Sequence, residues 1–296
     1  MTDPLFHPSA IHILKLVSGL PKAARERQQI LVLQAFIDDS HSKGEVLVLS
    51  GFIADALSWA KFSQEWQAML DGLRMPAFKM SHLAYGGGDI TTEHASWFYR
   101  IAETHARTSV TIAIREPLVA RIMDEFMLPP FQANPYNIAL PAIMKSLVLS
   151  DQLYGFKEPL EVIFDKQSGI EAPFLRAWDD FFETLSPREK QIFESRPRFE
   201  RDERFLPLQA ADLQAYWMRD YCKKGGKLKG MPNPYPWALK HVIQSIIIEP
   251  EEGQIRQIAT SYRAQYVKQS RERGLADQSI PDEALDFRGS QAEWSK

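Results

Sequence analysis

Three aspartates stand where a lone carboxylate would be costly, and together they could hold a metal ion. Asp38 and Asp165 each end an apolar segment that is typical of a buried strand. Asp212 lies within the apolar helical pattern 208–218, on the same stripe as Leu208. A carboxylate in such surroundings needs either a cationic side chain or a metal ion to compensate its charge.

The chemistry that such a group supports is phosphodiester hydrolysis. Clustered carboxylates raise one another's pKa, and a hard divalent cation removes that conflict. Mg²⁺ and Mn²⁺ favour oxygen ligands, and ions about 4 Å apart can activate water and stabilise a leaving oxygen. We therefore expect Asp38, Asp165 and Asp212 to be catalytic metal ligands for Mg²⁺ or Mn²⁺.

Simpler explanations of these aspartates remain open at this point. An aspartate at the end of a strand is often only a turn former, and Asp39 directly after Asp38 favours that explanation. Asp212 could instead pair with Arg219 or with an arginine between residues 196 and 204.

Hydrophobic periodicity predicts the elements that would position these acids. Strands are expected at 30–38, 45–53, 108–115 and 160–165, with a short extended piece at 77–81 and one more strand within 192–207. The glycines at 86–88 are expected to form a flexible loop. Helices are expected to begin after Asp55 and near Thr91, and to cover 117–126, 135–154, 173–185, 208–222, 237–247 and 253–266. A hairpin followed by alternating strands and helices indicates an α/β protein with a mixed sheet flanked by helices.

The chain divides by composition into four segments. We expect an N-terminal helical extension over 1–29, a core over 30–222 and C-terminal loop and helices over 223–267. Residues 268–296 form a polar tail that we expect to be poorly ordered.

The overall composition limits the possible partners. The 296 residues carry a net charge of −3, so a nucleic acid would have to meet a local basic patch. The single cysteine, Cys222, excludes an intrachain disulfide and a multi-cysteine zinc site. We find no phosphate-binding Walker loop, dinucleotide fingerprint or nucleophile elbow. No segment is suited to a signal peptide or membrane anchor, so we expect a cytoplasmic protein without a membrane partner.

Three motifs carry a resemblance to a known family. FIDDS in the first strand, VIFD in a later strand and LQAADL at the start of a late helix resemble the family called domain of unknown function 3800. The resemblance spans roughly residues 31–221. It implies a ribonuclease-H-like fold, in which an antiparallel hairpin is extended by parallel strands, and a metal-dependent nuclease activity that is generally unproven in the family.

The same resemblance assigns roles to individual residues. Asp38, Asp165 and Asp212 match its three acids, and Gln209 matches a motif glutamine that could orient a metal-bound water or a substrate group. The sequence departs from the family at Asp39, where glutamate is common, and at His41, where glycine often follows. These departures put the role of position 39 in doubt and leave Asp38 unaffected.

Ribonuclease-H-like enzymes usually need a fourth acid, and the sequence offers two candidates. Glu116, just after the strand 108–115, could point into the mouth of the site. Glu93 begins a helix, where the helix dipole explains a glutamate more simply.

Substrate contacts are expected from basic residues near the acids. Lys79 and His82 could form a substrate-binding pair, although such residues are more often plain surface. Lys223 and Lys224 could bind backbone phosphates. The other candidates, which could equally form a solvated charged face, are Lys227, Lys229, Arg196, Arg198, Arg201 and Arg204.

Two main functions therefore stay open from the sequence alone, with a metal-dependent hydrolase of small phosphorylated molecules as a third, weaker possibility. The first is a Mg²⁺- or Mn²⁺-dependent phosphodiesterase that cleaves DNA or RNA. The second is a nucleic-acid-binding or assembly protein that keeps the ribonuclease-H-like fold without catalysis. The absence of an unequivocal fourth acid favours the second.

Overall fold

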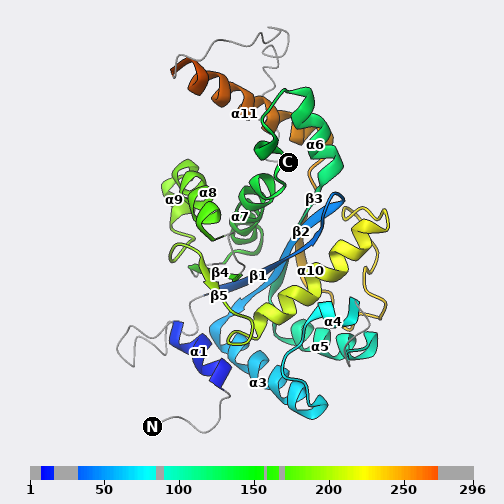
Figure 1. The fold of residues 1–296 in the computed structure, drawn as a ribbon. Helices are drawn as coiled ribbons and strands as arrows, with labels where there is room; N and C mark the ends of the chain where they lie inside the picture. The colour runs from blue at the N-terminus through cyan, green and yellow to red at the C-terminus, as the bar shows by residue number, and fades with distance from the viewer. Residues whose placement is uncertain (1–7, 17–32, 85–89, 157–158, 167–170, 273–296) are drawn as a thin grey trace.

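A mixed sheet of six strands organises the molecule (Figure 1). The strands lie side by side in the order β5-β4-β1-β2-β3-β6. Their bounds are Leu33–Ser42 for β1, Val46–Asp55 for β2, Thr108–Arg115 for β3, Leu160–Asp165 for β4, Arg198–Glu200 for β5 and Gln244–Ile248 for β6.

The strand directions define the fold class. β2 is antiparallel to both β1 and β3, whereas β4 is parallel to β1, β5 to β4 and β6 to β3. An antiparallel hairpin extended by parallel strands is the ribonuclease-H-like α/β architecture that the sequence predicts.

The computed structural model describes residues 8–16, 33–84, 90–156, 159–166 and 171–272. Its longer helices are α1 (Pro8–Leu16), α3 (Ala56–Leu73), α5 (Thr92–His105), α6 (Glu116–Glu125), α7 (Tyr136–Tyr154), α8 (Glu171–Thr184), α10 (Pro207–Lys223) and α11 (Glu252–Glu272). Short helices are α4 (Met80–Ala84), α9 (Pro187–Lys190) and the 3₁₀ turn η1 (Pro130–Ala133). No helix in these ranges is long and apolar enough to cross a membrane.

The sheet separates two apolar cores, and alternation along β1 assigns its side chains to one or the other. Phe36 packs on the side covered by α10, α3 and α5, while Ala35 and Ile37 pack on the side covered by α7 and α8. Because successive side chains of a strand point to opposite faces, Asp38 lies on the α10 side and Asp39 on the α7 side.

Local sequence explains how α10 and α3 take their places. Ala210, Ala211 and Ala215 are fully buried, and such small side chains let α10 lie close across β1 and β2. Asp55 ends β2 and caps α3, because its carboxylate accepts a hydrogen bond of 2.8 Å from the backbone N–H of Ser58. The prediction that Asp55 starts this helix is confirmed.

Three sequence predictions are wrong in detail. The segment 237–247 is not a helix, because its last part forms β6 and pairs with β3. β1 does not end at Asp38 but continues to Ser42, paired with β2 along its whole length. The extended piece expected over 77–81 turns into helix α4 at Met80.

The ends of the chain are described only in part. Of the expected N-terminal extension, α1 is described, and its Ile13 is fully buried in the α10-side core. Much of the expected polar tail, residues 273–296, and the glycines at 86–88 lie outside the described residues. The proposed boundaries between segments stay predictions.

Candidate metal centre

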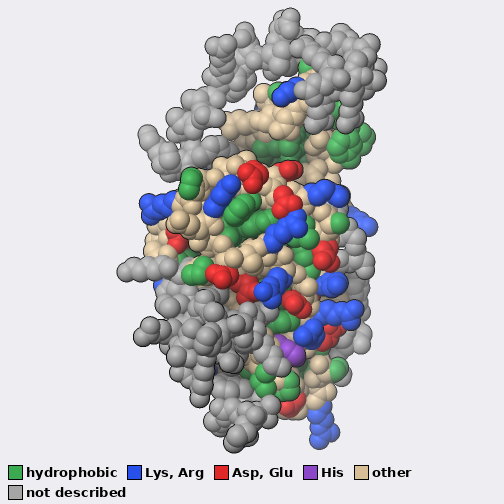
Figure 2. Space-filling view, turned by 90° about the vertical axis from the view of Figure 1, so that its left-hand side faces the viewer, with side chains coloured by type: hydrophobic (Ala, Val, Ile, Leu, Met, Phe, Trp, Pro, Cys, Tyr) green, Lys and Arg blue, Asp and Glu red, His purple; other side chains and the backbone are tan. Residues whose placement is uncertain are grey.

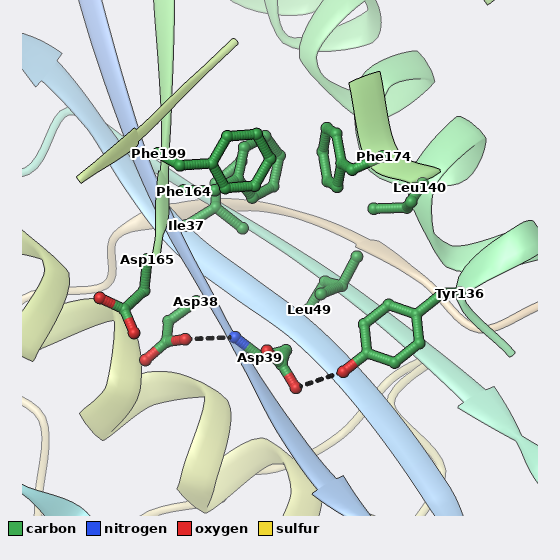
Figure 3. Close-up of a pocket in the computed structure, with 10 residues that line it drawn as sticks. All are labelled: Ile37, Asp38, Asp39, Leu49, Tyr136, Leu140, Phe164, Asp165, Phe174 and Phe199. Carbon is green, nitrogen blue, oxygen red and sulfur yellow. Dashed lines mark hydrogen bonds between the residues drawn. The ribbon is translucent and has the colours of Figure 1, made fainter. Parts of the chain in front are cut away.

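Asp38, Asp165 and Asp212 come together on the α10 side of the sheet. In the register of β1 and β4, Ile37 pairs with Phe164, so Asp38 and Asp165 follow as neighbours on adjacent parallel strands. Figure 3 shows their carboxylates side by side. Asp212 lies on α10, which crosses this face, and it is near enough to raise the pKa of Asp38. The structure therefore joins acids that lie far apart in the sequence.

The three carboxylates have raised pKa values because they are poorly solvated and close to one another. Burial raises the pKa of Asp38 well above its usual range, and the charges of Asp212 and Asp165 raise it further. Burial likewise raises the pKa of Asp165 to about 6 and that of Asp212 to about 6. Negative charge on these carboxyl groups is therefore only partly compensated by the surrounding protein.

Few groups compensate Asp212. Its Oδ2 accepts a hydrogen bond of 2.9 Å from the backbone N–H of Met80. Within the described ranges no arginine forms an ion pair with it; the guanidinium of Arg219 instead lies over the ring of Tyr216, 4.7 Å from its centroid. The ion pair considered for Asp212 at the sequence level is therefore not found there.

A further acid at this site, Asp202, is not among the residues predicted from the sequence. This residue is 8% exposed, and its charge raises the pKa of both Asp165 and Asp212. Lys79 forms an ion pair of 3.0 Å with Asp202, and its charge lowers the pKa of the same two aspartates. Lys79 thus lies at the acids as predicted, but with Asp202 as its partner.

Gln209 holds the segments that carry these groups. Its Oε1 accepts hydrogen bonds from the indole of Trp66 over 2.9 Å and the backbone N–H of Phe78 over 3.0 Å. Its Nε2 donates to the backbone carbonyl of Asp202 over 3.1 Å. The side chain is 1% exposed, so Gln209 positions the chain around Lys79 and Asp202 rather than facing a substrate.

The donor set suits a hard divalent cation, although the acids do not form a closed coordination shell. Carboxylate oxygens are the ligands that Mg²⁺ and Mn²⁺ prefer. Within the described residues, no group of three or more His, Cys, Asp or Glu side chains is arranged so that it could hold a metal ion. The aspartates are electrostatic neighbours, and a bound cation would have to draw them together.

Glu116 does not join this group, because it belongs to the other face of the sheet. It hydrogen-bonds the Nε2 of His41, and its second oxygen accepts from the backbone N–H of Gly44 over 3.1 Å. His41 shares the α7 face of β1 with Asp39, so Glu116 is not brought to Asp38. Glu93, the other candidate, is exposed in the first turn of α5.

A small apolar hollow adjoins the acids on the α7 side (Figure 3). Its lining includes Phe164, Phe174 and Phe199, with Asp38 and Asp165 at its edge. The cavity volume is about 20 Å³, which is room for about one water molecule. The hollow therefore does not enclose a small phosphorylated substrate.

The remaining basic candidates mostly have acidic partners. Lys223 pairs with Glu45 over 3.0 Å and Lys224 with Asp220 over 2.7 Å. Arg198 pairs with Glu161, and Arg196 with Asp179. Figure 2 shows cationic and acidic side chains interspersed on the face in view.

Of the other candidates, Arg201, Arg204 and Lys227 form no ion pair within the described residues, and Lys229 lies 3.7 Å from Glu251. Arg201, Lys227 and the weakly paired Lys229 are exposed. Arg204 lies over the ring of Phe205. His82 falls within α4, but its side chain lies outside the described residues.

Comparisons with known proteins leave the family open. No protein-family model matches the chain, and no curated protein sequence matches it. The resemblance to domain of unknown function 3800 therefore stays a prediction.

One solved structure that resembles the chain is a crystal structure of Bst-RNase HIII in complex with Mn²⁺. The match has 15% sequence identity and a TM-score of 0.39. It covers 70% of this chain and 61% of that one, so this chain spans less than two thirds of the matched structure. The fold class rests on the strand order and directions described above, and no function follows from this likeness.

Proposed function

We propose that the protein is a metal-dependent nuclease that hydrolyses phosphodiester bonds of DNA or RNA. The observation that carries the proposal is the convergence of Asp38, Asp165 and Asp212 on one face, with pKa values raised by burial and mutual repulsion. Carboxyl groups that are buried together with little compensating charge are suited to a cation, and strongly shifted pKa values are concentrated at functional sites.

The three aspartates would hold Mg²⁺ or Mn²⁺, with Asp202 as the fourth acid in place of Glu116. The cation would supply activation of water and stabilisation of the leaving oxygen. Lys79 lies beside the acids and is partly exposed, so its ammonium can orient a substrate phosphate while Asp202 holds it in place. Gln209 keeps both residues in position through the backbone of Phe78 and Asp202.

The test is cleavage of single- and double-stranded DNA and RNA with Mg²⁺ and with Mn²⁺. We expect wild-type protein to cleave at least one substrate and Asp212→Asn to abolish cleavage while keeping the fold. Asp220→Asn is the matched control, because it removes a carboxylate from the same helix that pairs with Lys224 instead. Cleavage should persist in this control.

A non-catalytic nucleic-acid-binding protein is the second candidate. The observation in its favour is that the described acids do not form a closed metal shell. Wild-type protein that binds nucleic acid but cleaves none of these substrates, with binding unaffected by Asp38→Ala, would replace the nuclease proposal by this one.

A further inference from the structure

Helix α10 runs across the sheet toward the tip of the β1–β2 hairpin (Figure 1). Asp212, Tyr216, Arg219 and Lys223 follow one another at spacings of four, three and four, which places them in one stripe on one side of the helix. Lys223 reaches the hairpin, where it contacts Ser42 and Glu45. The stripe thus continues the surface on which a strand bound at Asp212 would lie.

Arg219 differs from the other cations of this stripe and its surroundings. The neighbouring Lys223 and Lys224 are paired with Glu45 and Asp220. Arg219 is half-buried, and for its buried Nε no hydrogen-bond partner is found in the described part of the chain. The residue is only half-buried, and no ion pair is found for it in the described ranges, so the accessible part of its guanidinium is suited to an acceptor from outside the protein.

Tyr216 fixes the orientation of this guanidinium. The Arg219 guanidinium carbon lies 4.7 Å from the centre of the Tyr216 ring, which holds the planar group by a cation–π contact. Trp217 packs edge-on against the same ring, with the ring centres 5.3 Å apart. A guanidinium whose position is fixed in this way is suited to hydrogen bonds with a phosphate.

We infer that Arg219, held by Tyr216, binds a backbone phosphate of the nucleic-acid strand whose scissile phosphate lies at the aspartates. This inference rests on the proposed function, because it extends the same substrate along α10. Arg219 lies seven residues after Asp212, about 10 Å along the helix axis. Phosphates of a helical strand follow one another at about 3.4 Å along the duplex axis, so the contact lies about three nucleotides from the acids.

The experiment compares Arg219→Met with Arg176→Met. Arg176 is an exposed arginine on α8, behind the opposite face of the sheet, and no ion pair is found for it in the described ranges. Both variants remove one positive charge, so they match in their effect on net charge. Affinity for fluorescent 12-nucleotide single strands and duplexes is measured by anisotropy in EDTA, where metal-dependent cleavage cannot occur, over a series of salt concentrations.

We expect Arg219→Met to weaken binding roughly tenfold and to reduce the slope of log affinity against log salt by about 1. Arg176→Met should match wild type, and Arg219→Lys should restore part of the affinity, because it keeps the charge but loses the planar fork. Comparing the single-stranded with the duplex oligonucleotides shows whether the bound phosphate belongs to a single strand or to a duplex.

Equal losses in the two methionine variants, or wild-type protein that binds neither form of nucleic acid, would overturn the inference. A loss confined to Arg219→Met supports it even if no cleavage is observed. In that case the nuclease proposal fails, while the binding of the strand along α10 stands.

Discussion

The two faces of β1 carry acids that are neighbours in the sequence but differ in their surroundings. Asp38 lies on the α10 side, where burial and the charges of Asp212 and Asp165 raise its pKa. Asp39 lies on the α7 side, where its Oδ2 accepts a hydrogen bond of 2.7 Å from the hydroxyl of Tyr136. A neutral donor satisfies the second acid, whereas the first faces other acids.

The polar groups around Asp39 also satisfy one another. His41 is hydrogen-bonded to Glu116, and its ring lies edge-on to that of Tyr136, with the ring centres 6.1 Å apart. On the α7 face, polar side chains are paired by hydrogen bonds that stabilise the strand. On the α10 face, acidic side chains lie close to one another. Side-chain alternation, rather than residue type, decides which of two adjacent aspartates faces Asp165 and Asp212.

Replacing Asp38 or Asp39 by asparagine should give the largest difference between the two faces. We expect Asp38→Asn to lower metal-dependent cleavage more than about 100-fold, because loss of an indirect metal contact alone costs about 10- to 100-fold. Asp39→Asn should stay within a few fold of wild type, since its side chain points to the other face. Initial cleavage rates of the two variants measure this, and equal losses would contradict the assignment of faces.

Removing the glutamine that positions the acid face should have the next largest effect. Gln209→Leu leaves Trp66 Nε1 and the backbone N–H of Phe78 buried without their acceptor. We expect the free energy of unfolding to fall by about 2–4 kcal/mol. Urea denaturation measures the change.

Gln152→Leu is the control, because this exposed glutamine of α7 should change stability by less than about 0.5 kcal/mol. A Gln209→Leu loss of similar size to the control would show that Gln209 does not hold the site.

The elements around both faces could largely be predicted from the sequence. Alternation gives β3 its observed bounds, and the apolar periodicity gives α10 within a residue at each end. β6 could not be predicted, because its short apolar segment fits a helix equally well until pairing with β3 selects a strand. Such pairing is a long-range contact that local patterns do not contain.

The candidate site was predictable only in part for the same reason. The three aspartates carry a local signal, an acid at the end of an apolar segment or within one. Asp202 carries none, since it lies in a run of charged residues, and its burial and its ion pair with Lys79 arise only in the folded chain. The position of Glu116 depends on which face of the sheet the chain follows after β3. That face is known only once the register of the strands is known.

The raised pKa values of the aspartates on the α10 face should make the free energy of unfolding depend on pH. A carboxyl group whose pKa is raised on folding stabilises the folded state fully below its unfolded pKa near 4. That stabilisation is lost as the pH rises through the folded pKa, which is about 6 for Asp165 and Asp212. The free energy of unfolding without metal should therefore fall across this interval.

The variant Asp212→Asn isolates this contribution. We expect it to be more stable than wild type at pH 7 in EDTA, by on the order of 1–2 kcal/mol, and the difference to shrink toward pH 4. Urea denaturation at both pH values measures it. A variant that is less stable than wild type at pH 7 would mean that the Asp212 carboxylate is well compensated.

The smallest expected effect lies on the α7 face. Tyr136→Phe removes the hydrogen bond to Asp39 and should lower the free energy of unfolding by about 1 kcal/mol without changing cleavage. Tyr154→Phe on the same helix is the control, since no hydrogen bond is found for its hydroxyl in the described ranges. Thermal denaturation and cleavage assays check both, and a cleavage defect in Tyr136→Phe would extend the site to the α7 face.

The central claim is that acids distant in the sequence form one cation site on the α10 face. Calorimetric titration of Mg²⁺ or Mn²⁺ into wild type, Asp212→Asn and Asp39→Asn tests it most directly. We expect wild type and Asp39→Asn to bind the ion alike, with proton release near pH 6, and Asp212→Asn to bind at least about tenfold more weakly. Wild-type protein that takes up neither ion, or Asp212→Asn that binds as tightly as wild type, would contradict the account.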